Sequence, residues 1–107
     1  MRKLLIISAL LCTSAHAQFR TGNQLLSDMQ EPIGYRTGLA LGYVMGVTEA
    51  GNGVNFCLPG TVTAGQVSDM VKNRLISSPS VRHFSADIII GAVLEATWPC
   101  AKKGQSL

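Results

Sequence analysis

The sequence predicts an all-α fold, a compact bundle of about four helices with one intramolecular disulfide. Helices are indicated because apolar residues recur at helical spacing in four segments, and Pro, Gly or Ser residues separate these segments. The disulfide is indicated because only Cys57 and Cys100 remain once an N-terminal signal is removed.

Residues 1–17 have the pattern of a cleaved signal peptide. A basic start and an apolar run over residues 4–11 precede Ala15-His16-Ala17, the small-x-small pattern that signal peptidase accepts. The apolar run is about half the roughly 20 residues that a spanning helix needs. We therefore expect cleavage after Ala17, a single domain over residues 18–107, a bacterial periplasmic location and no membrane association after cleavage.

The composition limits the partners of the mature chain. Cleavage removes two basic residues and no acidic ones, so the formal net charge falls from +3 to +1. About 90 residues remain, enough for one modest core. No basic stripe suited to phosphates is visible, and we expect no nucleic-acid partner.

Cys57 and Cys100 are expected to pair in an oxidising compartment. The closed loop spans over forty residues, which corresponds to roughly 4 kcal/mol of stabilisation in the chain-entropy treatment. Two free thiols and an intermolecular bridge are the alternatives. His83 is the only histidine of the mature chain, and two Cys plus one distant His make a poor zinc site, so no metal is expected.

The first two helices are predicted from about Gly22 to Gln30 and from about Tyr35 to Ala50, with residues 31–34 as a Pro- and Gly-containing break. Three glycines of the second helix share one face: Gly38, Gly42 and Gly46. Each costs about 1 kcal/mol relative to Ala, so we expect tight helix packing in compensation, with a self-association face as the alternative.

The third helix has the clearest start signal. Thr63 is a good N-cap and Gln66 completes a capping box. Its inward stripe is predicted as Val67, Met70, Val71 and Leu75, and residues 77–80 end it.

The fourth helix is predicted from about Val81 to Thr97, ending before Trp98-Pro99. It is apolar nearly all round, which is typical of a central helix or of one partly covered by a second subunit.

Catalytic groups are scarce, and we expect neither an enzyme nor a cofactor. His83 and Asp87, four residues apart, are more typical of a helix-surface pair than of an acid–base unit. Gly51-x-Gly53 is too short for a nucleotide-binding loop.

Five short motifs in order carry a resemblance to a known family. They are Gly42-Tyr43-Val44-x-Gly46-Val47, Cys57-Leu58-Pro59, Val62-Thr63-x-x-Gln66-Val67, Ser78-Pro79-x-x-Arg82-His83 and Trp98-Pro99-Cys100. Together they resemble the Rap/Tai family of periplasmic immunity proteins against amidase effectors of type VI secretion. The resemblance covers about Phe19 to Cys100.

The resemblance implies a homodimer that inhibits a cognate peptidoglycan amidase effector by occlusion, pushing a loop into its groove. One departure is that family members often carry a second cysteine pair. Met29 and Leu39 or Ala40 occupy those regions here, which predicts a less firmly attached first helix.

Two loops are candidates for the contact. We predict that the segment Ser77–His83 supplies most of it because it is polar and Pro79 limits its freedom. The predicted contact residues are Ser78, Pro79, Ser80, Arg82 and His83. The second candidate is Gly51–Phe56, whose glycines imply more mobility; its Phe56 is alternatively buried beside the disulfide.

A competing interpretation is a periplasmic acid-stress chaperone, or another small helical binding protein. Such chaperones are small and disulfide-clipped, and they open at low pH. Protonation of only six acidic residues provides a small driving force for such an opening.

Overall fold

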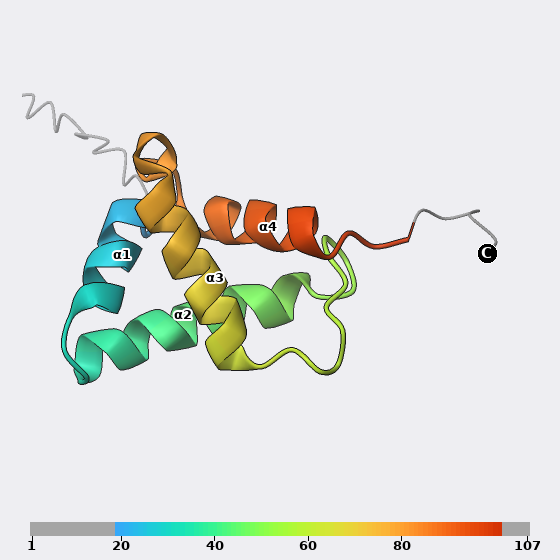
Figure 1. Ribbon diagram of the computed structural model, residues 1–107, viewed down its shortest axis with the longest axis horizontal. Coiled ribbons are helices and arrows are strands. Elements are labelled where there is room, and N and C mark those ends of the chain that lie inside the picture. The colour runs from blue at the N-terminus through green and yellow to red at the C-terminus, as the bar shows by residue number, and fades with distance from the viewer. Residues whose placement is uncertain (1–18, 102–107) are drawn as a thin grey trace, which may run out of the picture.

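Four α-helices follow one another in the computed structural model, which describes residues 19–101 (Figure 1). They are α1 (Gly22–Gln30), α2 (Tyr35–Gly51), α3 (Ala64–Ser77) and α4 (Ala86–Thr97), with one 3-10 turn, η1 (Pro79–Val81). The all-α prediction is confirmed. The predicted signal peptide, residues 1–17, lies outside the described residues.

Two helices begin with the same capping arrangement. At α3, the Thr63 amide donates to Gln66 Oε1 at 2.9 Å, and the Gln66 amide donates to Thr63 Oγ1 at 3.2 Å, as predicted. Thr21 and Gln24 form an equivalent box at α1, which the sequence analysis did not identify. Each box satisfies two amides that would otherwise lack a partner in the first turn.

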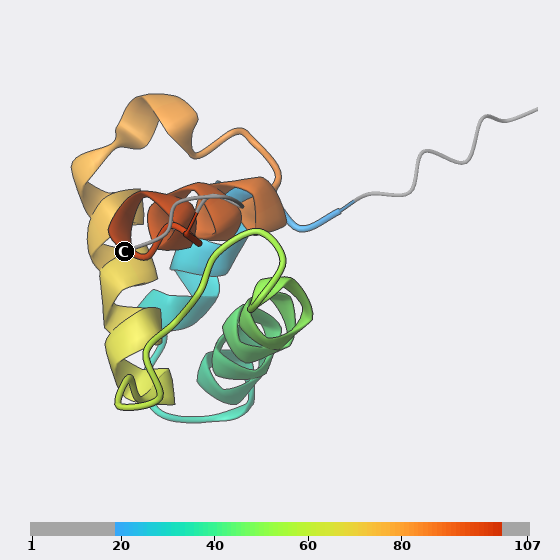
Figure 2. The ribbon, with the colours of Figure 1, turned by 90° about the vertical axis from the view of Figure 1, so that its right-hand side faces the viewer.

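One apolar core joins the four helices, and each helix contacts the other three. Figure 2 looks almost along α2 and α4 and shows α3 running across their side. The predicted stripe of α3 is confirmed, since Val67, Val71 and Leu75 are buried and Met70 is half-buried. The buried apolar residues are Leu25, Leu26, Met29, Ala40, Val44, Phe56, Val67, Val71, Leu75, Ala86, Ile89, Ile90 and Leu94.

The predicted tight packing of the α2 glycines is wrong for the single chain. Gly38, Gly42 and Gly46 are exposed, and among the described residues nothing lies within 4 Å of a Cβ built at any of them. Helix α2 instead buries the opposite face, which carries Ala40 and Val44. The glycine spacing identified a shared face correctly, but not the side on which it lies.

The fourth helix begins five residues later than predicted, at Ala86 instead of Val81. It is not a central helix either, since Ile88 is 63% exposed while Ile89 and Ile90 are buried. Backbone hydrogen bonds to the start of α1 hold residues 82–85 out of the helix.

A buried carboxylate links α1 to α2 in this chain, in the region where a second cysteine pair is missing. Asp28 is 5% exposed and forms ion pairs with Arg20 and with Arg36, the latter with a 2.8 Å distance between Arg36 Nε and Asp28 Oδ1. Arg36 also pairs with Glu31 at 2.9 Å. Burial alone would raise the pKa of Asp28, but hydrogen bonds from both guanidinium groups outweigh it and hold the pKa below its ordinary value.

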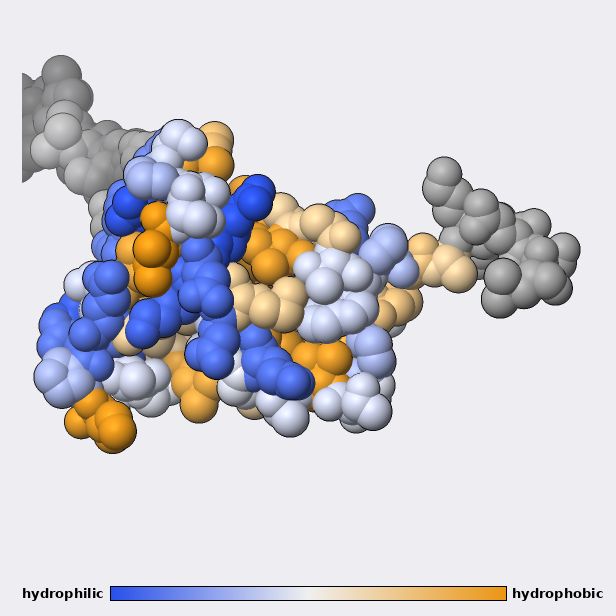
Figure 3. All heavy atoms as spheres, viewed as in Figure 1, coloured by the Kyte–Doolittle hydropathy of each residue, from blue (hydrophilic) through white to orange (hydrophobic). Residues whose placement is uncertain are grey.

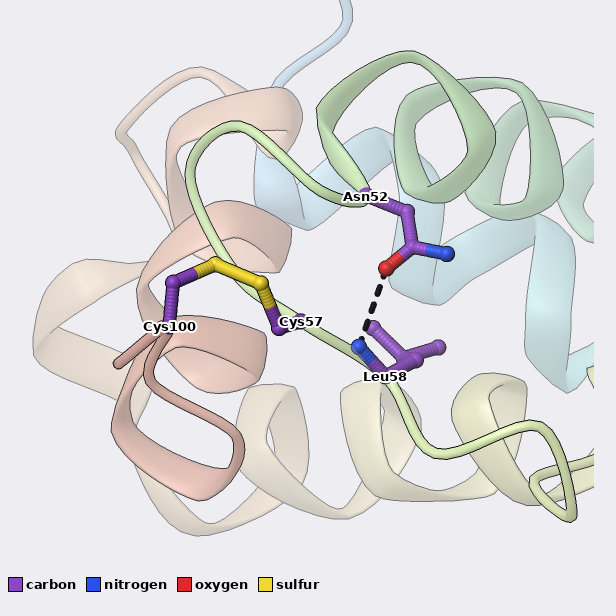
Figure 4. The surroundings of a disulfide bond; sticks show 4 residues. All are labelled: Asn52, Cys57, Leu58 and Cys100. Atoms are coloured by element: carbon purple, nitrogen blue, oxygen red, sulfur yellow. Dashed lines mark hydrogen bonds between the residues drawn. A yellow bond between two sulfur atoms is a disulfide. The ribbon is translucent and has the colours of Figure 1, made fainter. Parts of the chain in front are cut away.

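The predicted disulfide joins Cys57 to Cys100, and the two Cα atoms lie 4.9 Å apart (Figure 4). The Cys57 amide also donates to the Trp98 carbonyl at 2.9 Å. The loop ahead of α3 is therefore fixed to the end of α4. None of the helices in the described part of the chain is both long and apolar enough to cross a membrane.

Candidate functional site

The loop between α3 and α4, residues 78–85, contains all of the predicted contact segment Ser77–His83 except Ser77, which ends α3, and it is built as a series of tight turns. The Ser78 amide caps α3 by donating to the Arg74 carbonyl at 3.0 Å. Turn η1 follows, and the Phe84 amide donates to the Val81 carbonyl at 3.1 Å. Pro79 occupies the first position of η1, where its fixed φ suits the turn. Local hydrogen bonds thus restrict most of the loop.

Backbone hydrogen bonds to the start of α1 restrict the second half of this loop. The Gly22 amide donates to the Phe84 carbonyl at 2.9 Å, and the Asn23 amide donates to the Arg82 carbonyl at 2.8 Å. The Ala86 amide donates to the Arg20 carbonyl at 2.7 Å. The loop therefore leaves α3, turns outward and is held again before α4 begins.

Glycine is required where α1 meets this loop. A Cβ at Gly22 would lie 2.9 Å from the Arg82 carbonyl oxygen and 2.6 Å from Ile89 Cδ1. Any larger residue would push the loop or α4 away. Gly22 was not among the site residues predicted from the sequence, although a glycine directly after the Thr21 N-cap was the available signal.

The side chains of the predicted contact residues differ in accessibility. Pro79, Ser80 and His83 are exposed, while Ser78 and Arg82 are half-buried. The Arg82 Nε atom is buried and has no hydrogen-bond partner in the described part of the chain. The loop therefore brings three of the five residues to the surface together, and Arg82 is in part a packing residue.

His83 does not form the predicted pair with Asp87. The His83 ring lies against the Phe84 ring, with centroids 4.1 Å apart. Asp87 accepts a hydrogen bond from the Ser85 hydroxyl instead. Because α4 begins only at Ala86, His83 lies outside the helix and the expected spacing of one helical turn is absent.

The second candidate loop, Gly51–Phe56, folds back onto α2. Its amides close short turns, including Gly53 N–H to the Phe56 carbonyl at 2.7 Å, and Gly53 has a positive φ of 84°. Phe56 is buried, as the alternative interpretation predicted, and its ring lies 2.7 Å from a Cβ built at Gly51. Val54, 77% exposed, is its most accessible apolar side chain.

Neither loop gathers a cluster of side chains that could hold a metal ion. Within residues 19–101, no three His, Cys, Asp or Glu side chains lie close enough to share a metal ion. What the α3–α4 loop offers is a restricted shape with a proline, a hydroxyl and a stacked aromatic pair at its surface. These groups suit binding to another surface.

Comparison with known proteins gives one match. The family model for Rap1a immunity proteins matches residues 21–100, which include all four helices and both cysteines. Searches of curated proteins and of solved structures gave no significant match.

Proposed function

Because the chain belongs to the Rap1a family of immunity proteins, we propose that it neutralises a peptidoglycan amidase effector of type VI secretion. An immunity protein acts by binding its cognate effector. The finer proposal is that it occludes the amidase groove with the α3–α4 loop, in the periplasm, and without catalysis of its own.

The restricted α3–α4 loop carries this proposal. Its backbone is held by the cap on α3, by η1 and by hydrogen bonds to residues 20–23. A loop that is already ordered loses little conformational entropy on binding, which favours affinity. Its exposed Pro79, Ser80 and His83 side chains would supply shape and a few polar contacts, which suffice for blocking access to a groove.

The test is inhibition of a purified enzyme. The mature chain, residues 18–107, is titrated into each type VI amidase effector encoded by the same strain, and release of peptidoglycan fragments is measured. We expect one amidase to lose its activity at an equimolar ratio, and no fragments from the chain alone. If every amidase of the strain stays fully active at a large excess of the chain, the proposed function is wrong.

The location is proposed from the signal pattern at Ala15-His16-Ala17. Intact mass spectrometry of the periplasmic fraction should find a chain that begins at Gln18 and lacks two hydrogens because of the disulfide. A full-length chain in the cytoplasm would contradict this part of the proposal.

A homodimer is proposed on the family resemblance together with the outer face of α2. This face presents Tyr35, 82% exposed, and Leu39, 40% exposed, next to the three glycines. Apolar side chains and bare backbone on a surface helix favour a second covering element. Light scattering should give twice the mass of the mature chain, and Gly42→Glu should give the single mass. A wild-type protein with the single mass at high concentration would exclude the dimer.

A further inference from the structure

The outward side of α4 carries an apolar row that the single chain leaves uncovered. Phe84, directly before the helix, is 48% exposed, and Ile88 is 63% exposed. Ala92 lies one helical turn after Ile88 and is also exposed. We call these three residues the α4 row. Figure 3 shows apolar atoms at the surface beside α3, along α4.

Two hollows flank the α4 row, and Ile88 and Ala92 line both. The smaller one, about 120 Å³, lies between α3 and α4 and is also lined by Arg74, Val81 and Phe84. The larger one, about 520 Å³, lies on the other side, where Val54 of the second loop completes the wall. Ile88 thus protrudes between two depressions, so a partner surface could contact its side chain from both sides.

The α4 row is continuous with the proposed contact loop. The His83 ring of the loop lies against the Phe84 ring at a tilt of 35°, and Phe84 lines the same small hollow as Ile88. An effector seated on the exposed loop residues would therefore reach the α4 row without crossing an intervening element.

The charges beside the α4 row indicate the chemistry of the partner. Asp87 and Glu95 line the larger hollow, together with uncharged residues only. Neither carboxylate forms an ion pair within residues 19–101. A basic side chain of a partner would complement this edge, while an apolar side chain fits the small hollow.

We propose that the α4 row, centred on Ile88, is a second part of the effector-binding surface. It accepts a region of the amidase that presents an apolar side chain next to a lysine or arginine. This inference rests on the proposed function and extends it from the loop to the face of α4.

The test uses the amidase that the wild-type chain inhibits. Calorimetry measures the dissociation constant of the complex between this amidase and the wild-type chain, Ile88→Asp or Ile33→Asp. Ile33→Asp is the matched control because the Ile33 side chain is fully exposed in the α1–α2 turn. We expect Ile88→Asp to weaken binding about thirtyfold, as for a central anchor residue, and Ile33→Asp to leave it unchanged. Circular dichroism and thermal unfolding of both variants verify the fold, which an exposed position should preserve.

A second variant addresses the acidic edge. Glu95→Lys should lower the association rate at low salt and have a smaller effect at high salt, because exposed charges act over a screened range. Equal rates for this variant and wild-type at low salt would contradict the proposed basic partner group.

The outcomes separate the two proposals. If the wild-type chain inhibits an amidase and Ile88→Asp binds it as tightly as Ile33→Asp does, the α4 inference is overturned and the proposed function stands. If Ile88→Asp converts a dimer to a monomer, the α4 row is a self-association surface and the inference is wrong. If no amidase is inhibited, the proposed function fails and the inference fails with it.

Discussion

The two ends of the bundle are fastened by different chemistry. At the α1–α2 junction, the buried Asp28 carboxylate is held by Arg20 and Arg36. At the far end of α4, the Cys57–Cys100 disulfide closes a segment of 43 residues. The first link depends on charge and the second on a covalent bond, so different changes in the surroundings should release them.

The two links hold different loops, and only one of these is the proposed contact loop. The disulfide holds the α2–α3 loop against the end of α4, whereas the α3–α4 loop is held by backbone hydrogen bonds to residues 20–23. Arg20 takes part in both this backbone attachment and the ion pair with Asp28. We therefore expect loss of the Asp28 ion pairs to disturb the conformation of the α3–α4 loop more than loss of the disulfide does.

Removal of the disulfide should have the largest effect on stability. The double variant Cys57→Ser, Cys100→Ser should lose about 4 kcal/mol of unfolding free energy, the value expected for a loop of this length. Urea denaturation of the variant and of the reduced wild-type chain measures the loss, and the two should agree. A loss below about 1 kcal/mol would show that the covalent link contributes little.

Loss of the Asp28 charge should have the next largest effect. Asp28→Asn removes the carboxylate partner of Arg20 and leaves Arg36 paired with Glu31 alone. We expect a loss of about 2 kcal/mol, moderated because the Arg36 side chain is half exposed. The matched control is Asp69→Asn on the exposed side of α3, which should change stability by less than about 0.5 kcal/mol. Equal effects of the two substitutions would contradict a special role for Asp28.

Of the two links, acid should weaken the Asp28 ion pairs and leave the disulfide unchanged. Because the pKa of Asp28 is lowered in the folded chain, its stabilisation is present above its ordinary pKa, about 4, and is lost as the pH falls below that value. The stability difference between wild-type and Asp28→Asn should thus shrink from pH 5 to pH 3, while the contribution of the disulfide stays constant. Denaturation at each pH measures both. Complete unfolding with dissociation near pH 3 would favour the chaperone interpretation instead.

The smallest effects are expected at two glycines, with opposite signs. Gly22→Ala forces a Cβ against Ile89 and the Arg82 carbonyl and should destabilise by about 1–2 kcal/mol. Gly42→Ala adds a methyl group on an open helix face and should stabilise the monomer by roughly 1 kcal/mol. Thermal unfolding compares them. Destabilisation by Gly42→Ala that grows with protein concentration would place this glycine in the proposed dimer interface.

Local signals made several elements predictable. Residues 31–34 break the chain through a proline and a glycine, so the bounds of α1 followed directly from the sequence. The capping box at Thr63 and Gln66 fixed the start of α3 in the same way. The disulfide followed from the prediction that only Cys57 and Cys100 remain after signal cleavage.

Long-range contacts decided the features that the sequence analysis missed. The start of α4 is set by backbone hydrogen bonds between residues 82–86 and 20–23, which lie about sixty residues apart in the chain. The glycines of α2 share a face by their spacing, but burial of Ala40 and Val44 decides which side that face takes. Of the five predicted contact residues, the structure shows Pro79, Ser80 and His83 to be exposed. The close contact between Gly22 and the α3–α4 loop depends on the folded arrangement and has no signal in the local sequence of the loop.

The role of the α3–α4 loop can be measured as the affinity of one double variant for the inhibited amidase. Arg82→Ala with His83→Ala should raise the dissociation constant at least about tenfold, since these side chains belong to the proposed binding loop and its support. Gln30→Ala, an exposed change at the end of α1, is the control and should bind as wild-type does. An unchanged affinity of the double variant, with its fold intact, would show that another part of the chain blocks the enzyme.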